Sequence, residues 1–332
     1  MIYLLMLVFV LSLALTGVLR RYALAKNIMD IPNQRSSHRI PTPRGGGVAF
    51  VMGFLIAVPC LAYQGYLLWS ESSVIISAGF FVAALGFFDD RGHIDVRLRL
   101  LGHLAAGGFV VVGLGGIPSI TVFAWTIPAG LLLNFLAVIY LVWLLNLYNF
   151  MDGIDGIASV EAVSVCLSVA CLYWLSGHLT QAYVPLALAA GVCGFLYWNI
   201  PPARIFMGDA GSGFLGFMLG VLSLQASMVH AQFLWSWLIL LGVFVVDATI
   251  TIVRRGLRGV KIYEAHCSHA YQHATSQAGK HARVTMAVVV INMVWLFPMA
   301  LLVGLDYVNG CLGCLIAYAP LILLAFYFKA GK

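Results

Sequence analysis

Acidic and carboxamide side chains gather in one short stretch of a chain that is otherwise almost entirely apolar. Asn146, Asn149, Asp152 and Asp155 stand within ten residues, and a glycine follows each aspartate. Apolar runs flank this stretch on both sides. A polar group that faces lipid without a partner costs roughly several kcal/mol, so the stretch must lie at a membrane surface or line a cavity. Acidic residues placed there favour a functional site.

The pattern Asp-Gly-Ile-Asp-Gly at 152–156 has some likeness to a calcium-binding loop. An EF-hand loop needs further acids at fixed offsets and a terminal glutamate, and this stretch lacks them. Glycine after an aspartate instead permits a tight turn and a close approach of backbone to a ligand. Ordinary turn chemistry is the alternative, but two Asp-Gly pairs in register with two asparagines favour ligand binding.

A second acidic feature is the adjacent pair Asp89 and Asp90, followed by Arg91. Two carboxylates this close indicate either a bound cation or a raised pKa. The alternative is a solvated helix end with a local Asp–Arg pair.

The segment 201–213 combines an aromatic residue, an acid and several small residues just before an apolar run. Glycine, serine and backbone N–H groups at the start of a helix form an anion site that suits phosphate. Asp209 would repel that phosphate unless a divalent cation bridged them, and Mg²⁺ binds through one or two carboxylates and phosphate oxygens. Phe206 could stack on a base. Helix capping by Asp209 or Ser212 is the alternative.

Basic and imidazole groups follow one another between residues 254 and 273. His266, Cys267, His269 and His273 could pass for zinc ligands, but no second ligand pair stands apart in sequence to clamp a metal. Phosphate or sugar hydroxyls are the more economical partners of these groups. The basic run before them also suits contact with lipid headgroups.

The elements that must position these residues are membrane-spanning helices. Of the 332 residues, 62% are hydrophobic and 9% are charged, which is typical of an integral membrane protein. We expect one all-α polytopic domain over residues 1–332, since no separate soluble domain is visible. Eleven apolar runs are long enough for a hydrocarbon core of roughly 30 Å. They lie at about 2–19, 46–68, 73–88, 100–116, 127–145, 157–175, 181–198, 211–228, 233–253, 284–303 and 308–328.

Basic residues predict the orientation of these spans, because Lys and Arg accumulate in cytoplasmic connections. All 18 fall in connections on one side or in the C-terminal tail. This predicts a periplasmic N-terminus and a cytoplasmic C-terminus. Most of the 12 acids fall in the same connections, so we expect the active site on the cytoplasmic face. Carboxylates, a helix start suited to phosphate and basic groups are the parts that metal-assisted phosphoryl transfer needs.

In these motifs the chain resembles the polyprenyl-phosphate N-acetylhexosamine-1-phosphate transferases, or glycosyltransferase family 4. The resemblance covers nearly the whole chain. It rests on Asp89-Asp90, the block at 146–156, the segment 206–212, Asp247 before Arg254, and the loop at 266–273, all in family order. It implies transfer of an N-acetyl sugar-1-phosphate from a UDP-sugar to undecaprenyl phosphate, with release of UMP.

The resemblance also implies roles for individual residues. Asp209 would bind Mg²⁺ or Mn²⁺, either alone or with Asp89 and Asp90, and Asp89 would orient or deprotonate the lipid phosphate. The nucleotide would meet Asn149, Asp152 and Asp155, with Asp155 facing uracil and Phe206 stacking on it. Ribose, sugar or diphosphate would be contacted by His269 and His273. His266 and Arg39 complete the expected substrate-binding set.

Differences from the peptidoglycan branch of that family indicate which branch this chain resembles. That branch has three adjacent histidines and a third acid after the Asp pair, whereas this chain has spaced histidines and Gly92-His93. This favours the branch that initiates O-antigen or other surface polysaccharides in a bacterial inner membrane. Candidate sugars are N-acetylfucosamine, N-acetylquinovosamine and N-acetylglucosamine. We expect membrane lipids as partners and no nucleic acid, and the chain could act as a monomer or as a homodimer.

The rival interpretation is a cation-coupled transporter whose acids bind the ion. Transporter acids tend to lie near the bilayer midplane on broken helices. Here the acids fall mainly in the predicted cytoplasmic connections, which favours the enzyme.

Overall fold

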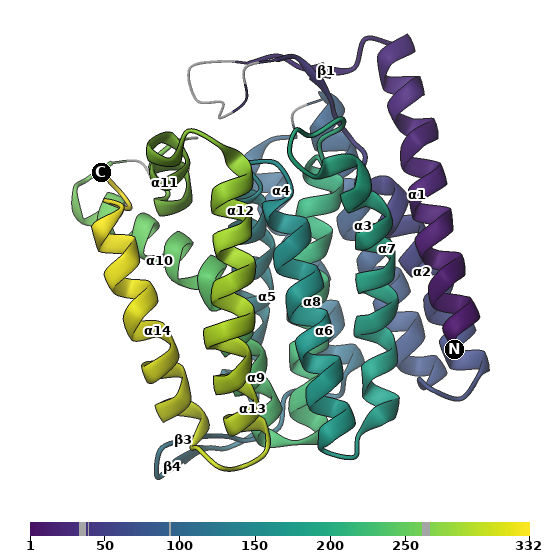
Figure 1. The fold of residues 1–332 in the computed structure, drawn as a ribbon. Helices are drawn as coiled ribbons and strands as arrows, with labels where there is room; N and C mark the ends of the chain where they lie inside the picture. Colours follow the sequence, from purple (N-terminus) through teal and green to yellow (C-terminus); the bar gives the residue numbers. More distant parts are fainter. Residues whose placement is uncertain (33–37, 39, 93, 261–265) are drawn as a thin grey trace.

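Long helices running between two ends form a bundle, and two short antiparallel strand pairs lie outside it (Figure 1). The structure is a computed structural model that describes residues 1–32, 38, 40–92, 94–260 and 266–332. The helices, in chain order, are α1 (Ile2–Ala25), α2 (Val48–Tyr63), α3 (Trp69–Gly92), α4 (Val96–Gly113), α5 (Leu131–Met151), α6 (Ile157–Leu175), η1 (Leu179–Ala182), α7 (Tyr183–Asn199), α8 (Asp209–Val229), α9 (Ala231–Leu240), α10 (Gly242–Leu257), α11 (Ala270–Ala278), α12 (His281–Val290), η2 (Ile291–Leu296), α13 (Phe297–Gly304) and α14 (Gly310–Tyr327).

The strands occur as two hairpin-like pairs. The first joins β1 (Met29–Asp30) to β2 (Thr42–Pro43), and the second joins β3 (Ile120–Val122) to β4 (Trp125–Ile127). The two pairs lie at opposite ends of the bundle, as do the two chain termini (Figure 1). The chain is therefore an all-α polytopic membrane protein, as its composition predicts.

The apolar helices account for each of the eleven predicted spans, although not all as straight crossings. In the described part of the chain, nine helical segments are long and apolar enough to cross a membrane, and the bent pair α9 and α10 adds a tenth. The remaining span corresponds to α2, whose 16 residues reach about 24 Å. The assignment of the bundle ends to the two sides of a membrane stays a prediction.

The predicted span at 233–253 is bent, because it is made of two helices and not of one. α9 and α10 meet at 70° around Leu241. Gly242 packs so closely on Tyr318 that an added Cβ would lie 3.0 Å from the ring. α10 then carries Asp247, Arg254 and Arg255, so its polar residues need partners that a lipid-facing helix would not provide. The bend directs these residues toward the end of the bundle that bears the other acids.

Close helix contacts bring the acidic segments together. α8 is the most buried of the long apolar helices in the described chain and packs against α3 and α5. A Cβ on Gly86 of α3 would lie 2.6 Å from the carbonyl oxygen of Asp209, the first residue of α8. Likewise a Cβ on Gly47 would lie 2.6 Å from Cα of Gly211. Glycine at these positions lets the end of α3 and the start of α2 meet the start of α8.

Candidate active site

A cavity of about 230 Å³ lies where the acidic segments meet, at the end of the bundle that carries β1, β2 and α11. Its polar or aromatic lining residues come from segments that are far apart in the sequence. They are Asp30, His38, Arg44, Asp90, Asn149, Asp152, Asp155, Asn199, Phe206, Asp209, Ser212, Gln272 and His281. The polar island at 146–156 therefore lines a shared cavity with the other predicted loops.

Asp90 and Asp209 are brought together by the contact between α3 and α8. Asp90 lies in the last turn of α3, although the sequence predicted a loop from residue 89, and its Oδ2 accepts a hydrogen bond from Ala210 N at 3.3 Å. Gly208 has φ +78, and a Cβ there would lie 2.7 Å from the same Oδ2. The glycine before Asp209 therefore serves both a left-handed backbone and the space that Asp90 occupies.

Asp89 takes a different direction from its neighbour. Its carboxylate forms an ion pair with Arg99 of α4 and accepts a hydrogen bond from Ile94 N at 2.9 Å. It lines a smaller cavity of about 20 Å³, together with Arg99, His103, Asn149 and Asp209. Asp90 thus lines the larger cavity and Asp89 the smaller one, and Asn149 and Asp209 line both cavities.

The loop between α5 and α6 is held by hydrogen bonds on both sides. Asp155 Oδ2 accepts from Ala203 N at 3.0 Å, and its Oδ1 lies 3.2 Å from His281 Nδ1. Thr285 Oγ1 donates to the Asp155 carbonyl oxygen at 2.9 Å. Asp155 therefore joins the segment before Phe206 to α12, in addition to bordering the cavity.

Asp152 has an unusual electrostatic environment. Burial raises its pKa well above the ordinary value of 3.8, and the nearby carboxylates of Asp209, Asp155 and Asp90 raise it further. Five aspartates line this cavity, Asp30 among them, and so many acids favour either retained protons or a bound cation. The cavity is thus chemically suited to a positively charged or metal-bound ligand.

Asn199 ties two walls of the cavity together. Its Oδ1 accepts from Gly156 N at 3.1 Å, and its Nδ2 donates to the Ile205 carbonyl oxygen at 3.0 Å. It ends α7 and is buried. Sequence reasoning missed this residue, because a single asparagine at the end of an apolar run has no distinctive spacing.

Phe206 is placed by pairing with the first loop. Its N–H donates to the Pro43 carbonyl oxygen at 2.8 Å, and its own carbonyl accepts from Gly46 N at 2.9 Å. The ring meets that of His38 edge-on, with centroids 4.8 Å apart. Phe206 thus presents an aromatic wall to the cavity, as its predicted stacking role requires.

Arg44 is the second residue that sequence reasoning missed. Its guanidinium donates to the Asp90 carbonyl oxygen and lines the cavity. In the sequence Arg44 stands between Pro43 and three glycines, a composition typical of a turn that gives no sign of a binding role. Within the described residues it is the only Lys or Arg on the cavity wall, so it supplies positive charge among the acids.

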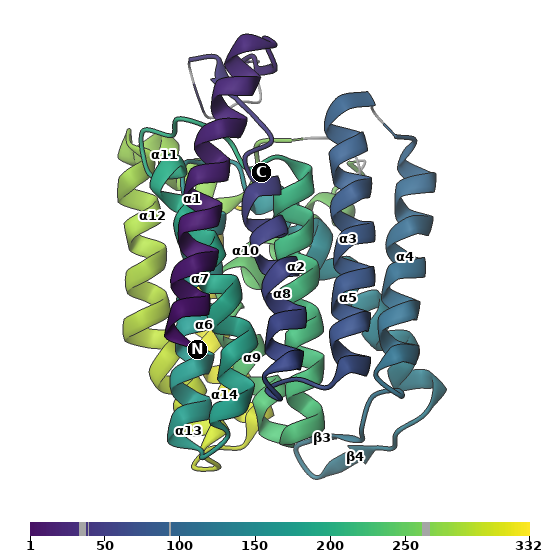
Figure 2. The same cartoon turned by 90° about the vertical axis from the view of Figure 1, so that its right-hand side faces the viewer.

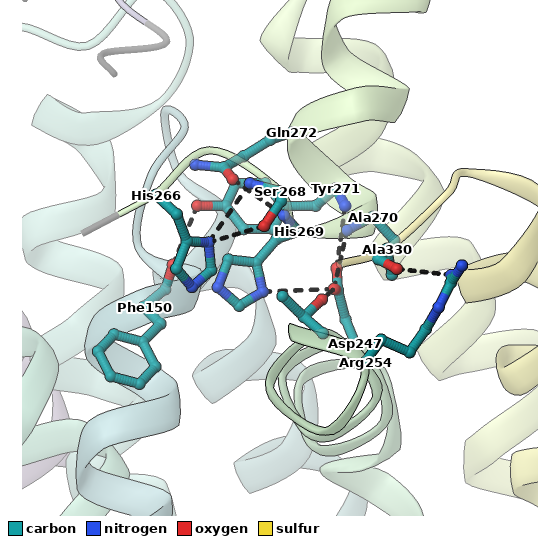
Figure 3. A network of polar contacts seen from close by, with 11 residues as sticks. Phe150, Asp247, Arg254, His266, Ser268, His269, Ala270, Tyr271, Gln272 and Ala330 are labelled. Atoms are coloured by element: carbon teal, nitrogen blue, oxygen red, sulfur yellow. Dashed lines mark hydrogen bonds and ion pairs between the residues drawn. The ribbon is translucent and has the colours of Figure 1, made fainter. Parts of the chain in front are cut away.

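The histidine loop is organised by Asp247 of α10, as Figure 3 shows. The Asp247 carboxylate accepts from Ala270 N at 2.8 Å and Tyr271 N at 2.9 Å, which caps the start of α11. His269 Nδ1 lies 3.4 Å from Asp247 Oδ1. His266 and Tyr271 stack on the His269 ring, with centroids 4.9 and 5.8 Å away. The loop is therefore a packed unit with little freedom.

The predicted histidines do not line the 230 Å³ cavity. His269 is buried, and of the described residues between 266 and 281 only Gln272 and His281 line it. Tyr271 Oη connects the loop to the cavity by donating to the Phe150 carbonyl oxygen at 3.0 Å. Neither Gln272 nor His281 had a sequence signal. Arg39, also predicted to bind substrate, lies outside the described residues.

Comparison with known proteins identifies a matching sequence family. A sequence model described as glycosyl transferase family 4 matches residues 72–227. That stretch runs from α3 to α8 and carries Asp89, Asp90, Asp209 and the block at 146–156. Over residues 72–227 the chain matches glycosyl transferase family 4.

Proteins similar to this chain are named as transferases of N-acetyl sugar phosphates. A probable undecaprenyl-phosphate N-acetylglucosaminyl 1-phosphate transferase of Bacillus subtilis is 29% identical over 291 residues, covering 85% of this chain and 79% of the relative. The decaprenyl-phosphate N-acetylglucosaminephosphotransferase of Mycobacterium leprae is 28% identical, covering 82% and 76%. A phospho-N-acetylmuramoyl-pentapeptide-transferase of Kocuria rhizophila is 29% identical, covering 73% and 77%.

Proposed function

We propose that this protein transfers an N-acetylhexosamine 1-phosphate from a UDP-linked donor to undecaprenyl phosphate. A phosphate oxygen of the lipid forms a bond to the β-phosphorus of the donor. The bond from that phosphorus to the bridging oxygen breaks, UMP leaves, and the sugar remains on a lipid-linked diphosphate. The observation that carries the proposal is the meeting of Asp90, Asp209 and Phe206 in one cavity at the end of a membrane bundle.

Mg²⁺, or Mn²⁺, is the metal that the donor set fits. Among the described residues, no three His, Cys, Asp or Glu side chains are arranged so that they could hold a metal ion. Mg²⁺ needs fewer, because it usually keeps several waters and binds one or two carboxylates plus substrate phosphates. Asp90 and Asp209, with Asp152 beside them, would hold it. When bound, the metal neutralises charge on the diphosphate.

On this proposal, the other cavity residues form a region for the phosphates and a region for the uracil base. Arg44 is placed to bind a phosphoryl oxygen near Asp90, since a guanidinium favours phosphate. Asn199, Asp155 and the Phe206 ring form the region for the uracil base. Base stacking on an aromatic ring and hydrogen bonding by an amide are suited to uridine recognition.

An apolar groove of about 440 Å³ fits the isoprenoid chain of the acceptor. It lies between α10, α11, α12 and α14, and Tyr271 belongs to its wall and also contacts the loop of the cavity. Its apolar lining includes Val246, Ala274, Val284, Ala287, Val288, Leu324 and Phe328. An isoprenoid gains favourable free energy from such a surface, roughly 25 cal/mol for each Å² buried.

The direct test is turnover by the purified protein in lipid nanodiscs. It combines undecaprenyl phosphate, Mg²⁺ and one UDP-sugar at a time, beginning with UDP-N-acetylglucosamine and then the N-acetylfucosamine and N-acetylquinovosamine donors. We expect UMP release and a lipid-linked product with one of them. Asp209→Asn and Asp90→Asn should lose turnover. Asp306→Asn, at an exposed position with φ +62 where asparagine is well tolerated, is the matched control. No UMP from any donor would overturn the proposal.

A further inference from the structure

Two arginines converge on one tryptophan at the surface of the bundle, away from the cavity. The guanidinium carbon of Arg20 lies 5.9 Å from the centroid of the Trp198 ring, and that of Arg204 lies 4.7 Å from it. Arg204 also lies 4.5 Å from the Tyr197 ring. Arg20 comes from α1 and Arg204 from the segment before α8, so two distant parts of the chain build this cluster.

The cluster has fixed geometry. Trp198 Nε1 donates to the Leu13 carbonyl oxygen at 2.9 Å, which holds the indole across α1. Gly17 leaves room for the ring, since a Cβ there would lie 3.0 Å from it. Arg20 Nε donates to the Arg204 carbonyl oxygen at 3.1 Å. Arg204 also donates to the Tyr197 carbonyl oxygen.

Within the described part of the chain, no ion pair balances the positive charge of the cluster. Among the described residues, no carboxylate lies within 4.0 Å of either guanidinium. Each guanidinium has five N–H donors, and the described residues provide a carbonyl acceptor for one of them. Two like charges beside one ring attract an anion that can accept several hydrogen bonds at once.

The depth of the cluster indicates where that anion comes from. Arg20 lies 18 residues after Ile2, the start of α1, which places it about 27 Å along the helix. A hydrocarbon core is roughly 30 Å thick, so Arg20 falls near the level of the headgroups. Figure 2 shows α1 at the outer face of the bundle, over α7. Tryptophan and tyrosine are also enriched at that level.

We propose that Arg20, Arg204 and Trp198 form a binding site for the phosphate of an anionic phospholipid. The lipid bridges α1 to the segment 199–208. That segment carries Phe206 and leads into Asp209, so the bound lipid stabilises one wall of the cavity. This site is separate from the proposed reaction, and its test does not need turnover.

The first experiment uses the unmodified protein. Arginine labelling by phenylglyoxal is compared in nanodiscs of phosphatidylcholine with and without phosphatidylglycerol, and each labelled arginine is located by mass spectrometry. We expect several-fold slower labelling of Arg20 and Arg204 in the anionic lipid. Arg21, an exposed neighbour on the same helix, is the internal control and should change little.

Three outcomes would overturn the proposal. Equal labelling of Arg20 in both lipids, or equal protection of Arg21, would leave only a general effect of surface charge. Inorganic phosphate is the third arm, added to the phosphatidylcholine discs. Protection by phosphate as strong as that by phosphatidylglycerol would assign the site to soluble anions instead.

A variant pair provides the second experiment. Arg20→Gln removes the charge but keeps an N–H donor for the Arg204 carbonyl oxygen, and Arg21→Gln removes a matched charge one residue away. The gain in Tm from phosphatidylglycerol over phosphatidylcholine should fall by at least half in Arg20→Gln and persist in Arg21→Gln. An equal gain in both variants contradicts the proposal.

Discussion

His281 and Asp155 form a contact that joins α12 to the loop between α5 and α6. The imidazole Nδ1 lies 3.2 Å from Asp155 Oδ1 and 3.3 Å from Asp155 N. Both residues line the cavity. One turn further along α12, Thr285 bonds the carbonyl oxygen of the same aspartate. The face of α12 that meets the loop therefore positions Asp155, and His281 is the member of that face that lines the cavity.

The first prediction concerns this pair. His281→Gln should raise the KM for the UDP-sugar about tenfold, because a hydrogen bond to a charged group contributes about 1.5–3 kcal/mol. The KM for undecaprenyl phosphate should change little. If the pair acts as a unit, the double variant with Asp155→Asn should be no worse than the worse single variant. His178→Gln, at the opposite end of the bundle, is the control. Additive losses would show that the two side chains act independently.

The sequence was sufficient to predict the membrane helices and the gathering of the acids at one end. In an apolar chain, polar segments between long apolar runs must lie at the ends of the helices, because the hydrocarbon core excludes unpaired polar groups. This is why Asp90, Asp152 and Asp209 could be expected in one site. The same reasoning could not separate Asp89 from Asp90, since their different partners depend on the approach of α4.

The second prediction follows from the charge at Asp152. Its pKa is raised in the folded protein, so the unfolded chain gives up this proton at lower pH than the folded chain does. Stability from this group is therefore present below the unfolded value of 3.8 and is lost as pH rises toward the folded value. Asp152→Asn should raise Tm at neutral pH in the presence of a chelator, and the difference should shrink toward pH 4.

Metal addition gives the matching comparison for Asp152. Mg²⁺ should raise the Tm of the unmodified protein, release protons on binding, and stabilise Asp152→Asn less. Calorimetry in buffers of different ionisation enthalpy measures the released protons. A metal response of equal size in the variant would place the cation away from Asp152.

The third prediction tests the packing of the histidine loop on the cavity loop. A Cβ on Gly153 would lie 2.0 Å from Tyr271 Oη, so Gly153→Ala forces the two loops apart. We expect a loss of stability of about 1–3 kcal/mol, as for other overpacked sites, with reduced turnover. Tyr271→Phe removes the obstructing oxygen at the cost of its bond to Phe150, about 1 kcal/mol. The double variant should recover part of the stability lost in Gly153→Ala. No recovery would show that the Tyr271 hydroxyl is not the obstruction.

Most of the site residues that the sequence did not predict lie outside its motifs. Arg44, Asn199 and His281 stand apart from the motifs, and periodicity or spacing gives no signal for one residue. Gln272 lies inside the predicted histidine loop, where the sequence indicated its histidine neighbours instead. The roles of these residues arise from contacts such as the approach of Gly47 to Gly211, which places the first loop beside Asp209. The bend between α9 and α10 was missed for a similar reason, because a continuous apolar run does not record a change of direction.

The fourth prediction separates the acceptor from the donor. Ala287 of α12 is exposed and lines the apolar groove, so Ala287→Trp fills the groove without disturbing buried packing. The KM for undecaprenyl phosphate should rise several-fold while the KM for the UDP-sugar stays unchanged. Met286→Trp is the matched control, because Met286 is an exposed neighbour on the same helix and is absent from the groove lining. Short-chain acceptors provide a second comparison. The KM for a lipid too short to occupy the groove should be the same in Ala287→Trp as in the unmodified protein. Equal effects of the two tryptophan variants on the long acceptor would move the isoprenoid chain to another face of the bundle.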